Sequence, residues 1–391
     1  MKRAHRQYLR NYLLIVLIAA LSLIVLNGLA DPYNAYPVSR SAALATWRDG
    51  TQTRQFKAET IAEGDWQVLL FGSSRAQVGL NPGNPVFGDL RVYNAGLPGA
   101  QFDELMAVVL YGLHTNPSLG RMVILIHPVQ FFASNSAPSA DYAKSLFNPE
   151  LDPVDYHAGN LLGAAATEES MHVVRNWLDQ QSPSTNRLGF RTRPVLGPSQ
   201  SYRQAFEQTM GNWSQSRKTY HADRMTRLRE VLGQCARRGV QVDLLIAPTH
   251  VLGLMILKRN NMIGAFDTCK RDMTNVARQV NQNAGRTMVR IYDALIVSPW
   301  TCEPVPEGSG QSMQYFWEQV HFKDRFGDAM LQRIWTGEPS DVAVLLESGT
   351  IDAHFQRQNT LLDDYELAHP KDVAWVQRLA RTTTDTNSTA E

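Results

Sequence analysis

The chain has 391 residues, 43% of them hydrophobic, so it can bury a large core as one big domain or two smaller ones. Its 38 Lys and Arg residues balance 37 Asp and Glu residues, and a formal charge of +1 gives no reason to expect a nucleic-acid partner. The sequence contains no Cys-x-x-Cys pair and no His/Cys cluster, so we expect neither a metal site nor a cofactor.

The first 30 residues have the pattern of a membrane anchor. Basic residues stand before an apolar run from Tyr12 to Leu29, namely Lys2, Arg3, Arg6 and Arg10. A run of about 18 residues is near the lower limit for crossing a bilayer, and basic flanks stay in the cytoplasm. We therefore predict a cytoplasmic tail over 1–11 and a single transmembrane helix over 12–29. In a bacterium this is the inner membrane, and the rest of the chain lies in the periplasm.

A cleaved signal peptide is the alternative, because Gly28-Leu-Ala30 resembles a cleavage site. The apolar run is longer than the usual core of a signal peptide, about 7–15 residues, which favours a retained anchor. The three cysteines, Cys235, Cys269 and Cys302, fit the oxidising periplasm, where one disulfide and one free thiol can form. Three small buried hydrophobic side chains explain them equally well.

Strand-like and helix-like segments alternate after the anchor. Apolar runs of strand character occupy 67–71, 91–94, 122–126, 240–246 and 288–292. Helical spacing of apolar residues occupies 103–113, 168–181, 222–238, 263–282, 327–335 and 352–365. This alternation predicts an α/β fold with a doubly wound, mostly parallel sheet of the flavodoxin-like type.

We divide the rest of the chain by composition. A juxtamembrane linker covers 30–62 and the α/β domain covers 63–337, with an extension at 338–381. An insertion at about 133–215 is rich in Ser, Pro, Asn and Gly, and we interpret it as a cap on the substrate side. The tail at 382–391 is polar and predicted to be disordered.

The first strand-like run leads directly into two serines, in the stretch Gln67-Val-Leu-Leu-Phe-Gly-Ser-Ser-Arg75. Side chains just beyond the carboxyl end of a strand lie in the crevice where open α/β sheets bind ligands. Ser74 is therefore our candidate nucleophile. A serine after a strand is also a common helix N-cap, and that reading remains open.

A second stretch, Trp317-Glu-Gln-Val-His-Phe-Lys-Asp324, supplies what a serine nucleophile lacks. Glu318 and His321 are three positions apart, which places them on one face if the segment forms a helical turn. A carboxylate that orients an imidazole, and an imidazole that activates a hydroxyl, make a Ser-His-acid relay. The two stretches together predict catalysis by Ser74, His321 and Glu318.

These residues resemble three blocks of the SGNH (GDSL-type) hydrolase superfamily, and most of all its membrane-anchored, envelope and alginate O-acetylation-like branch. The family block Gly-Asp-Ser is similar to Gly72-Ser-Ser74, and the family block Asp-x-x-His is similar to Glu318-Gln-Val-His321. The stretch Val92-Tyr-Asn-Ala-Gly-Leu-Pro-Gly99 looks like the block that ends in an oxyanion-hole glycine.

The resemblance implies that the backbone N–H groups of Ser74 and Gly99 stabilise an oxyanion. It also implies an oxyanion-hole Asn after the third strand, where this chain has His127-Pro-Val-Gln130 instead. Gln130 or Asn94 is the candidate substitute. Glu318 stands where the family has Asp, and the longer acid must reach the imidazole through a different rotamer.

Two further residues are candidates for substrate binding. His250 follows a strand in Ile246-Ala-Pro-Thr-His250, and so can reach the same crevice, although a structural loop histidine has the same pattern. Arg75 follows the nucleophile directly and can bind an anionic polymer or pair with an internal acid, the second being favoured.

The resemblance and the anchor together predict a periplasmic O-acyltransferase that acetylates an exopolysaccharide or another envelope glycan. Its partners would be a polysaccharide acceptor and a membrane-embedded protein that delivers acyl groups, because acyl-CoA is absent outside the cytoplasm. Two alternatives remain. One is a carbohydrate esterase that uses the same three side chains, and the other is an inactive SGNH-like subunit for polysaccharide binding or assembly.

Overall fold

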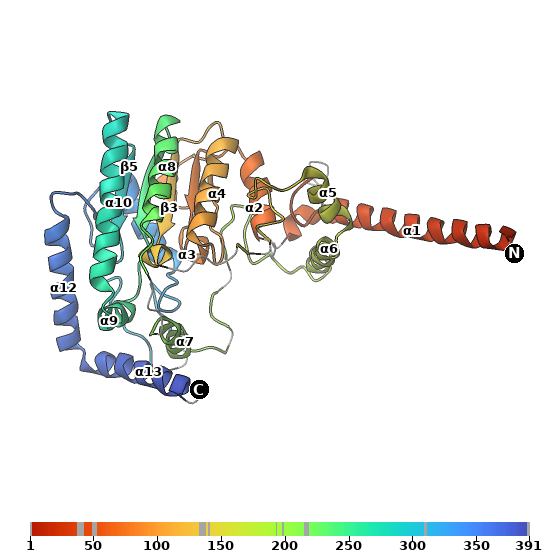
Figure 1. The fold of residues 1–391 in the computed structure, drawn as a ribbon. Coiled ribbons are helices and arrows are strands. Elements are labelled where there is room, and N and C mark those ends of the chain that lie inside the picture. The colour runs from red at the N-terminus through yellow and green to blue at the C-terminus, as the bar shows by residue number, and fades with distance from the viewer. Residues whose placement is uncertain are drawn as a thin grey trace. The chain divides into compact units, whose positions relative to one another are not determined.

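The structure, a computed structural model, describes residues 2–36, 43–48, 53–132, 138–139, 141–192, 194–197, 199–214, 219–308 and 311–388. Its contacts divide the chain into two compact units (Figure 1). The first comprises Met1–Gly64 and Pro138–Arg187, and the second comprises residues 65–137 and 188–391. The insertion expected at 133–215 is therefore shared between the two units.

The second unit is built on a six-stranded sheet with the order β2-β1-β3-β4-β5-β6. The strands are β1 (Val68–Phe71), β2 (Val92–Asn94), β3 (Arg121–Ile126), β4 (Gln241–Ile246), β5 (Val289–Asp293) and β6 (Val344–Leu345). β1 to β5 pair in parallel, whereas β6 pairs antiparallel with β5. The prediction of an α/β fold with a mostly parallel sheet is confirmed. Strand β6, only two half-buried residues long, was not predicted.

Parallel pairing brings the carboxyl ends of β1 to β5 to one edge of the sheet. Ladder hydrogen bonds continue one residue beyond two strands, since the N–H groups of Ala95 and Ala247 donate to the carbonyls of Leu70 and Ile126 at 2.8 Å each. Side chains that follow these strands in the sequence therefore lie at the same edge. In a parallel sheet this edge is where ligands bind.

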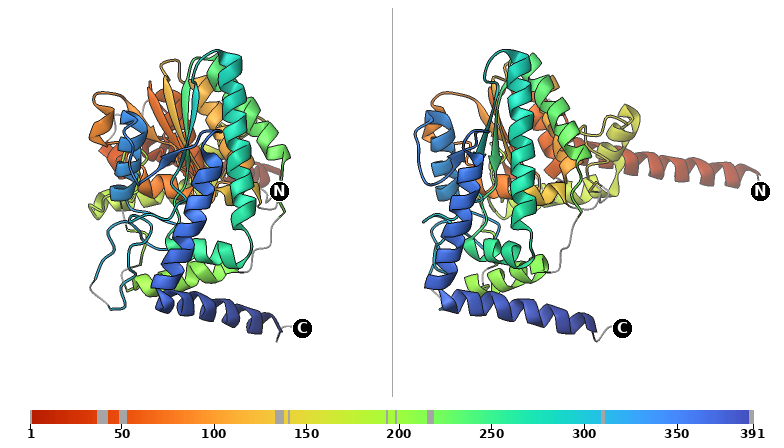
Figure 2. Two further views of the ribbon diagram at one scale, coloured as in Figure 1. Left: turned by 90° about the vertical axis from the view of Figure 1, so that its left-hand side faces the viewer. Right: turned by 60° about the vertical axis from the view of Figure 1, so that its left-hand side comes forward.

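Helices cover the buried sheet. All four residues of β1 are buried, which suits a strand with both faces covered. One layer contains α4 (Phe102–Thr115), α8 (Asp223–Arg237) and α10 (Ile263–Ala284), which lie along one face of the sheet. On the opposite face α11 (Asp324–Thr336) packs against α3 (Ser74–Gly79), as the left view of Figure 2 shows.

The C-terminal extension belongs to the sheet unit. It contains α12 (Ile351–Ala368) and α13 (Pro370–Ser388), and α13 packs against α7 (Tyr202–Ser214) and α9 (Val251–Arg259). The indole N–H of Trp375 donates to the Glu207 carboxylate at 3.1 Å. α13 extends to Ser388, into the tail for which disorder is predicted from residue 382, and residues 389–391 lie outside the described residues.

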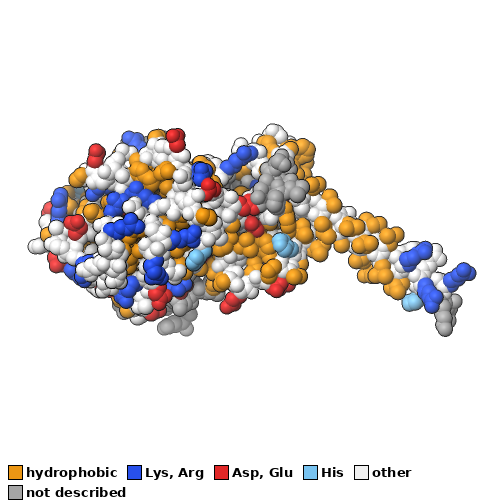
Figure 3. Space-filling model, turned by 90° about the horizontal axis from the view of Figure 1, so that it is seen from above, with side chains coloured by type: hydrophobic (Ala, Val, Ile, Leu, Met, Phe, Trp, Pro, Cys, Tyr) orange, Lys and Arg blue, Asp and Glu red, His pale blue; other side chains and the backbone are white. Residues whose placement is uncertain are grey.

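The first unit contains α1 (Lys2–Ala30), η2 (Ala43–Trp47), α2 (Thr53–Glu63), α5 (Pro153–Leu162) and α6 (Ala164–Leu178). α1 is one continuous helix that is long and apolar enough to cross a membrane. Figure 3 shows apolar side chains along its surface and Lys and Arg side chains near its N-terminal end. The expected linker at 30–62 contains η2 and α2. The helix expected at 168–181 begins and ends earlier, as α6.

Two short 3-10 helices complete the described elements, η3 (Pro85–Phe87) and η4 (Pro128–Phe131). All three cysteines are free thiols, Cys235 and Cys269 buried and Cys302 partly buried. The structure therefore agrees with the reading of the cysteines as packed side chains rather than with a disulfide.

Candidate active site

Ser74 is the first residue of α3, just beyond β1. Gly72 makes the sharp turn between them, with φ of +153°, and a Cβ atom there would lie 2.9 Å from the Leu125 carbonyl oxygen. Only glycine fits this position without strain. The first N–H groups of a helix have no intrahelical acceptor, so the N–H of Ser74 lies at the sheet edge without a helical partner. The N-cap residue of α3 is Ser73 and not Ser74, and the Ser73 side chain makes no capping hydrogen bond.

Glu318 and His321 lie in a hairpin and not in a helical turn. Phe316 pairs antiparallel with Phe322, and the Trp317 N–H donates to the His321 carbonyl at 2.8 Å. Here the Glu318 carboxylate bonds the backbone in place of helical hydrogen bonds. It accepts hydrogen bonds from the N–H groups of Val320 and His321, at 3.0 and 2.8 Å. A side chain that bonds its own backbone in this way stabilises a turn.

The structure brings Ser74, His321 and Glu318 together. Ser74 Oγ lies 2.8 Å from His321 Nε2, although the two residues are 247 positions apart in the chain. His321 Nδ1 is hydrogen-bonded to Glu318 Oε1. Because an ionised carboxylate only accepts, Nδ1 carries the proton and Nε2 is free to accept from the Ser74 hydroxyl. This is the order of bonds in a Ser-His-acid relay.

The surroundings of Glu318 keep its carboxyl ionised. Its side chain is buried, which by itself would raise its pKa. The hydrogen bond from His321, the charge of that imidazole and the two backbone N–H groups outweigh burial and leave the pKa of Glu318 lowered. The His321 side chain keeps 23% of its surface exposed. The acid is therefore sequestered, while the imidazole remains open to solvent on one side.

Packing against α3 fixes the hairpin beside Ser74. Phe322, directly after His321, is fully buried, and a Cβ atom on Gly79 would lie 2.1 Å from its ring. The absence of a side chain at Gly79 thus makes room for Phe322 at the end of the helix that Ser74 begins. The same helix therefore positions both ends of the Ser74–His321 hydrogen bond.

Gly99 lies in a turn held beside the nucleophile. The Leu97 N–H donates to the Gly72 carbonyl at 2.9 Å, which extends the pairing of β1 with β2 toward Ser74. Gly99 has φ of +69°, is exposed, and would bring an added Cβ within 4 Å of nothing. The turn thus presents its backbone on an open surface beside the nucleophile.

Asn94, one of the two expected substitutes for the oxyanion-hole Asn, does not fit that role. Its Nδ2 donates to the carbonyls of Ala76 and Leu80, both at 2.7 Å, and its Oδ1 accepts from the Gly96 N–H at 2.8 Å. Both amide hydrogens are therefore used inside the fold, and the side chain has no exposed surface. Asn94 fixes α3 and the following turn instead.

Gln130, the other candidate for the oxyanion-hole Asn, contacts the turn that contains Gly99. Its Oε1 accepts from the His127 N–H at 3.1 Å, which makes it part of a capping box at η4. Its Nε2 donates to the carbonyl of Ala100, the residue after Gly99, at 3.2 Å. This bond uses one of the two amide hydrogens. The structure therefore brings Gln130 to the end of the Gly99 turn, where it also supports the local backbone.

His250 does not line the candidate site, and its predicted binding role does not agree with the structure. It is only 1% exposed, and it caps the N-terminus of α9. Its Nδ1 accepts from the Leu252 N–H at 3.4 Å, and its Nε2 donates to the Glu303 carbonyl at 2.6 Å. Burial lowers its pKa to about 4, against the opposing effects of the Glu303 carbonyl and of Asp372.

Arg75 is also buried, so it presents little surface to a polymer. Burial lowers its pKa to about 10, while the Glu318 charge acts in the opposite direction. The structure thus favours the internal role for Arg75, where its positive charge lies within electrostatic reach of the relay carboxylate.

Sequence reasoning missed Lys323, two positions after His321. Its Nζ donates to the Tyr202 hydroxyl at 2.9 Å and to the Met313 carbonyl at 2.5 Å, and it lies 4.3 Å from the centre of the Trp317 ring. It therefore connects the hairpin to α7. The aromatic residues around it in the sequence were a usable signal, since cations pack on such rings.

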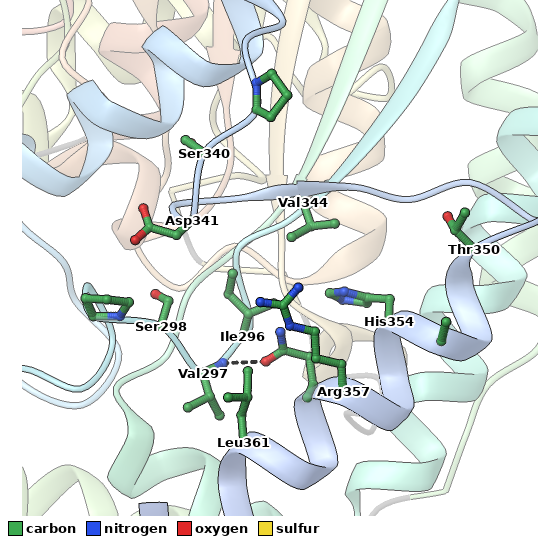
Figure 4. Close-up of a pocket in the computed structure, with 14 residues that line it drawn as sticks. Ile296, Val297, Ser298, Ser340, Asp341, Val344, Thr350, His354, Arg357 and Leu361 are labelled. Atoms are coloured by element: carbon green, nitrogen blue, oxygen red, sulfur yellow. Dashed lines mark hydrogen bonds between the residues drawn. The ribbon is translucent and has the colours of Figure 1, made fainter.

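A separate cavity of about 890 Å³ lies between the loop after β5 and α12. Figure 4 shows His354 and Arg357 extending into it from α12. Ser74, Glu318 and His321 are not among the residues that line it. Within the described part of the chain, no group of three or more His, Cys, Asp or Glu side chains could hold a metal ion.

Comparisons with known proteins add little to this geometry. No protein-family model matches the chain, and no curated protein matches it. A solved structure from Streptococcus pneumonia, which carries the provisional name platelet activating factor, is similar over 75% of this chain and 94% of its own. The two share 8% sequence identity with a TM-score of 0.37.

Proposed function

We propose that this chain is an SGNH-type serine acyl-transfer enzyme, anchored in a membrane, that O-acetylates an envelope glycan. One observation carries the proposal, the continuous hydrogen-bonded relay from Ser74 Oγ through His321 to Glu318. Ser74 is 247 positions from His321, so local chain geometry does not account for their contact. A relay for activating a hydroxyl is the chemistry that the arrangement fits best.

In the proposed first half-reaction, His321 Nε2 takes the Ser74 hydroxyl proton while Oγ attacks the acyl carbonyl carbon of the donor. The tetrahedral intermediate collapses, the bond to the leaving group breaks, and His321 returns the proton to that group. Glu318 holds the imidazole in the required tautomer and stabilises its charged form. The product is an acyl group in ester linkage to Ser74.

In the second half-reaction, an acceptor hydroxyl attacks the ester carbonyl carbon and gives its proton to His321. The bond between Ser74 Oγ and the acyl carbon then breaks, and His321 returns the proton to Oγ. The N–H groups of Ser74 and Gly99 are the proposed oxyanion donors, with Gln130 as the third. Water as acceptor makes the enzyme an esterase. A sugar hydroxyl bound in position can reach an effective molarity of about 10⁵ M and outcompete water.

The SGNH assignment has architectural support besides the relay. The strand order β2-β1-β3-β4-β5 and helices on both sheet faces are those of a doubly wound sheet. In such a sheet, a nucleophile after β1 and a His-bearing loop before the last helix meet at the carboxyl edge. The relay has this placement, with His321 three residues before α11.

The glycan acceptor, the membrane-embedded acyl donor and the periplasmic location follow from the anchor and the family resemblance. α1 supports the anchor, since its apolar surface is exposed along most of its length. Outside the cytoplasm an acyltransferase lacks acyl-CoA, so we propose that a membrane partner supplies the acyl group beside α1.

The direct test is acylation of the full chain in detergent micelles by p-nitrophenyl acetate, followed by intact-mass and peptide analysis. We expect one acetyl adduct on Ser74, lost in Ser74→Ala and kept in Ser73→Ala, the matched control one residue away. A wild-type chain that stays unmodified, or that is modified elsewhere, would count against the proposal. Product analysis with and without an oligosaccharide acceptor then separates transferase from esterase.

A second candidate, a non-catalytic subunit for glycan binding or assembly, is favoured by one observation. Gln130 stands where the family has an oxyanion-hole Asn, and both ends of its amide already bond the local backbone. On this reading Ser74→Ala leaves glycan acetylation in cells intact, whereas Ser74→Trp, which fills the crevice, abolishes it. Loss of acetylation in both variants supports the enzyme.

A further inference from the structure

Asn27, near the C-terminal end of α1, forms hydrogen bonds to α5 and α6. Asn27 interrupts the apolar run of α1, yet it has no exposed surface. Its Nδ2 donates to the Leu161 carbonyl at 2.9 Å and to Thr167 Oγ1 at 3.0 Å. Three residues later, the Ala30 carbonyl accepts from Arg48 Nε at 3.1 Å. The last turns of α1 are therefore held by α5, α6 and η2.

The position of Asn27 along α1 sets the depth of its partners. The 18-residue apolar run from Tyr12 to Leu29 rises about 27 Å as a helix, close to the hydrocarbon thickness of a bilayer of about 30 Å. Asn27 is two residues from the end of this run. If α1 crosses a bilayer, the Leu161 carbonyl bonded to Asn27 must lie at the boundary between hydrocarbon and headgroups.

Both helices bonded to Asn27 also expose apolar side chains. On α5, Val154 is 74% exposed and Leu162 is 46% exposed, with the exposed Ala158 between them at helical spacing. On α6, Met171 and Leu178 are seven residues apart, and both are more than half exposed. Both helices belong to the same unit as α1 and pack against it.

The other exposed side chains of the two helices indicate headgroup rather than hydrocarbon depth. Trp177, 41% exposed beside Leu178, is a residue type that concentrates at membrane interfaces. Asp155, His157 and Glu168 are exposed on the same helices and require water or lipid headgroups. Short helices that combine apolar and charged exposed faces are typical of segments that lie in the plane of the interface.

We propose that α5 and α6 form an interfacial platform, embedded in the outer headgroup layer of the bilayer that α1 crosses. Lipid is the occupant of their exposed apolar surface. The inference rests on the membrane anchoring proposed above and not on the chemistry of Ser74. It assigns a lipid-contacting role to the first half of the insertion, which the sequence suggested as a cap for substrate.

The test uses full chains with single added cysteines, in a Cys302→Ala background because the other two native thiols are buried. Leu162→Cys and Leu178→Cys probe the platform, Leu17→Cys probes α1, and Leu367→Cys is the control. Leu367 is a matched control because it is 82% exposed and apolar but lies on α12. Each thiol carries a bimane fluorophore, and the chains are reconstituted in vesicles of phosphatidylcholine and phosphatidylglycerol.

We expect a headgroup nitroxide lipid to quench the probes at 162 and 178 several-fold more than the probe at 367, and aqueous iodide to quench in the reverse order. Suppose that the probes at 162 and 178 are quenched no more than the probe at 367, while the probe at 17 is quenched by an acyl-chain nitroxide. The interfacial platform is then refuted, although the transmembrane anchor is supported. If the probe at 17 is not quenched, the inference fails at its premise. Neither result changes the Ser74 adduct, which is measured separately.

Discussion

Two histidines of the sheet unit, His250 shortly after β4 and His321 in the hairpin before α11, are used by the structure in opposite ways. His250 is closed off, because one ring nitrogen accepts from a backbone N–H and the other donates to a backbone carbonyl. His321 is open, because its ring nitrogens bond only to the side chains of Glu318 and Ser74. A position after a strand, as His250 has, therefore does not by itself make a histidine available for catalysis. What decides it is whether the backbone already occupies its ring nitrogens.

The largest effect is expected when the rates of Ser74 acetylation are compared between a His321 variant and a His250 variant. His321→Gln removes the base, and the rate of Ser74 acetylation by p-nitrophenyl acetate should fall by about 10³–10⁴-fold. His250→Asn keeps an N-cap side chain at α9 and should change this rate only several-fold. Stopped-flow release of nitrophenolate measures both rates, with circular dichroism as the control for folding. Equal losses in two folded variants would show that the comparison is wrong.

A second prediction concerns the acid that makes His321 different. In Glu318→Gln the amide can donate as well as accept, so the imidazole no longer has its proton fixed on Nδ1. We expect acylation to fall by about 10²–10⁴-fold with the fold retained. Glu318→Asp, the acid of the family pattern, serves as the matched control and should recover part of the rate. A Gln variant with the wild-type rate would mean that the carboxylate only stabilises the hairpin.

The third prediction concerns how the free energy of unfolding depends on pH because His250 is buried. The pKa of His250 is lowered to about 4 from its ordinary 6.5, so below pH 6.5 the unfolded chain binds a proton that the folded chain does not. The free energy of unfolding should therefore fall as pH drops from 6.5 to 4, by up to about 3 kcal/mol from this residue. Urea titrations at several pH values should give a flatter pH dependence for His250→Asn. Identical slopes would contradict the burial of His250.

The sequence predicted the parts of this comparison that depend on local pattern. The five parallel strands are short segments rich in apolar residues, so their presence and their order along the chain could be predicted from the sequence. Ser74, Glu318 and His321 were identified because their spacing and order resemble a family pattern. The sheet then brings them to one edge, which the alternation of strands and helices also implied.

The features that could not be predicted from the sequence are those that depend on hydrogen bonds between residues far apart in the chain. Whether His250 is open or closed is decided by the carbonyl of Glu303, 53 residues away. The two amide hydrogens of Asn94 are taken by the carbonyls of Ala76 in α3 and of Leu80 just after it, and no sequence pattern identifies these as its acceptors. The spacing of three between Glu318 and His321 suits both a helical turn and a hairpin, so the sequence alone did not distinguish them. Such partners become visible only in three dimensions.

The smallest effect is expected from a variant in α7. It tests whether the position of the His321 imidazole depends on the hydrogen bond between Lys323 and Tyr202. Tyr202→Phe keeps the ring that lies 5.3 Å from Lys323 Nζ but removes the hydroxyl that accepts from it at 2.9 Å. Lys323 retains the Met313 carbonyl as acceptor, so stability should fall by only about 0.5–1.5 kcal/mol, measured by urea unfolding. Acylation of Ser74 should change by less than in Glu318→Gln, because Glu318 fixes His321 from within the hairpin itself. A loss as large as that of Glu318→Gln would mean that α7, and not the hairpin, holds the imidazole in place.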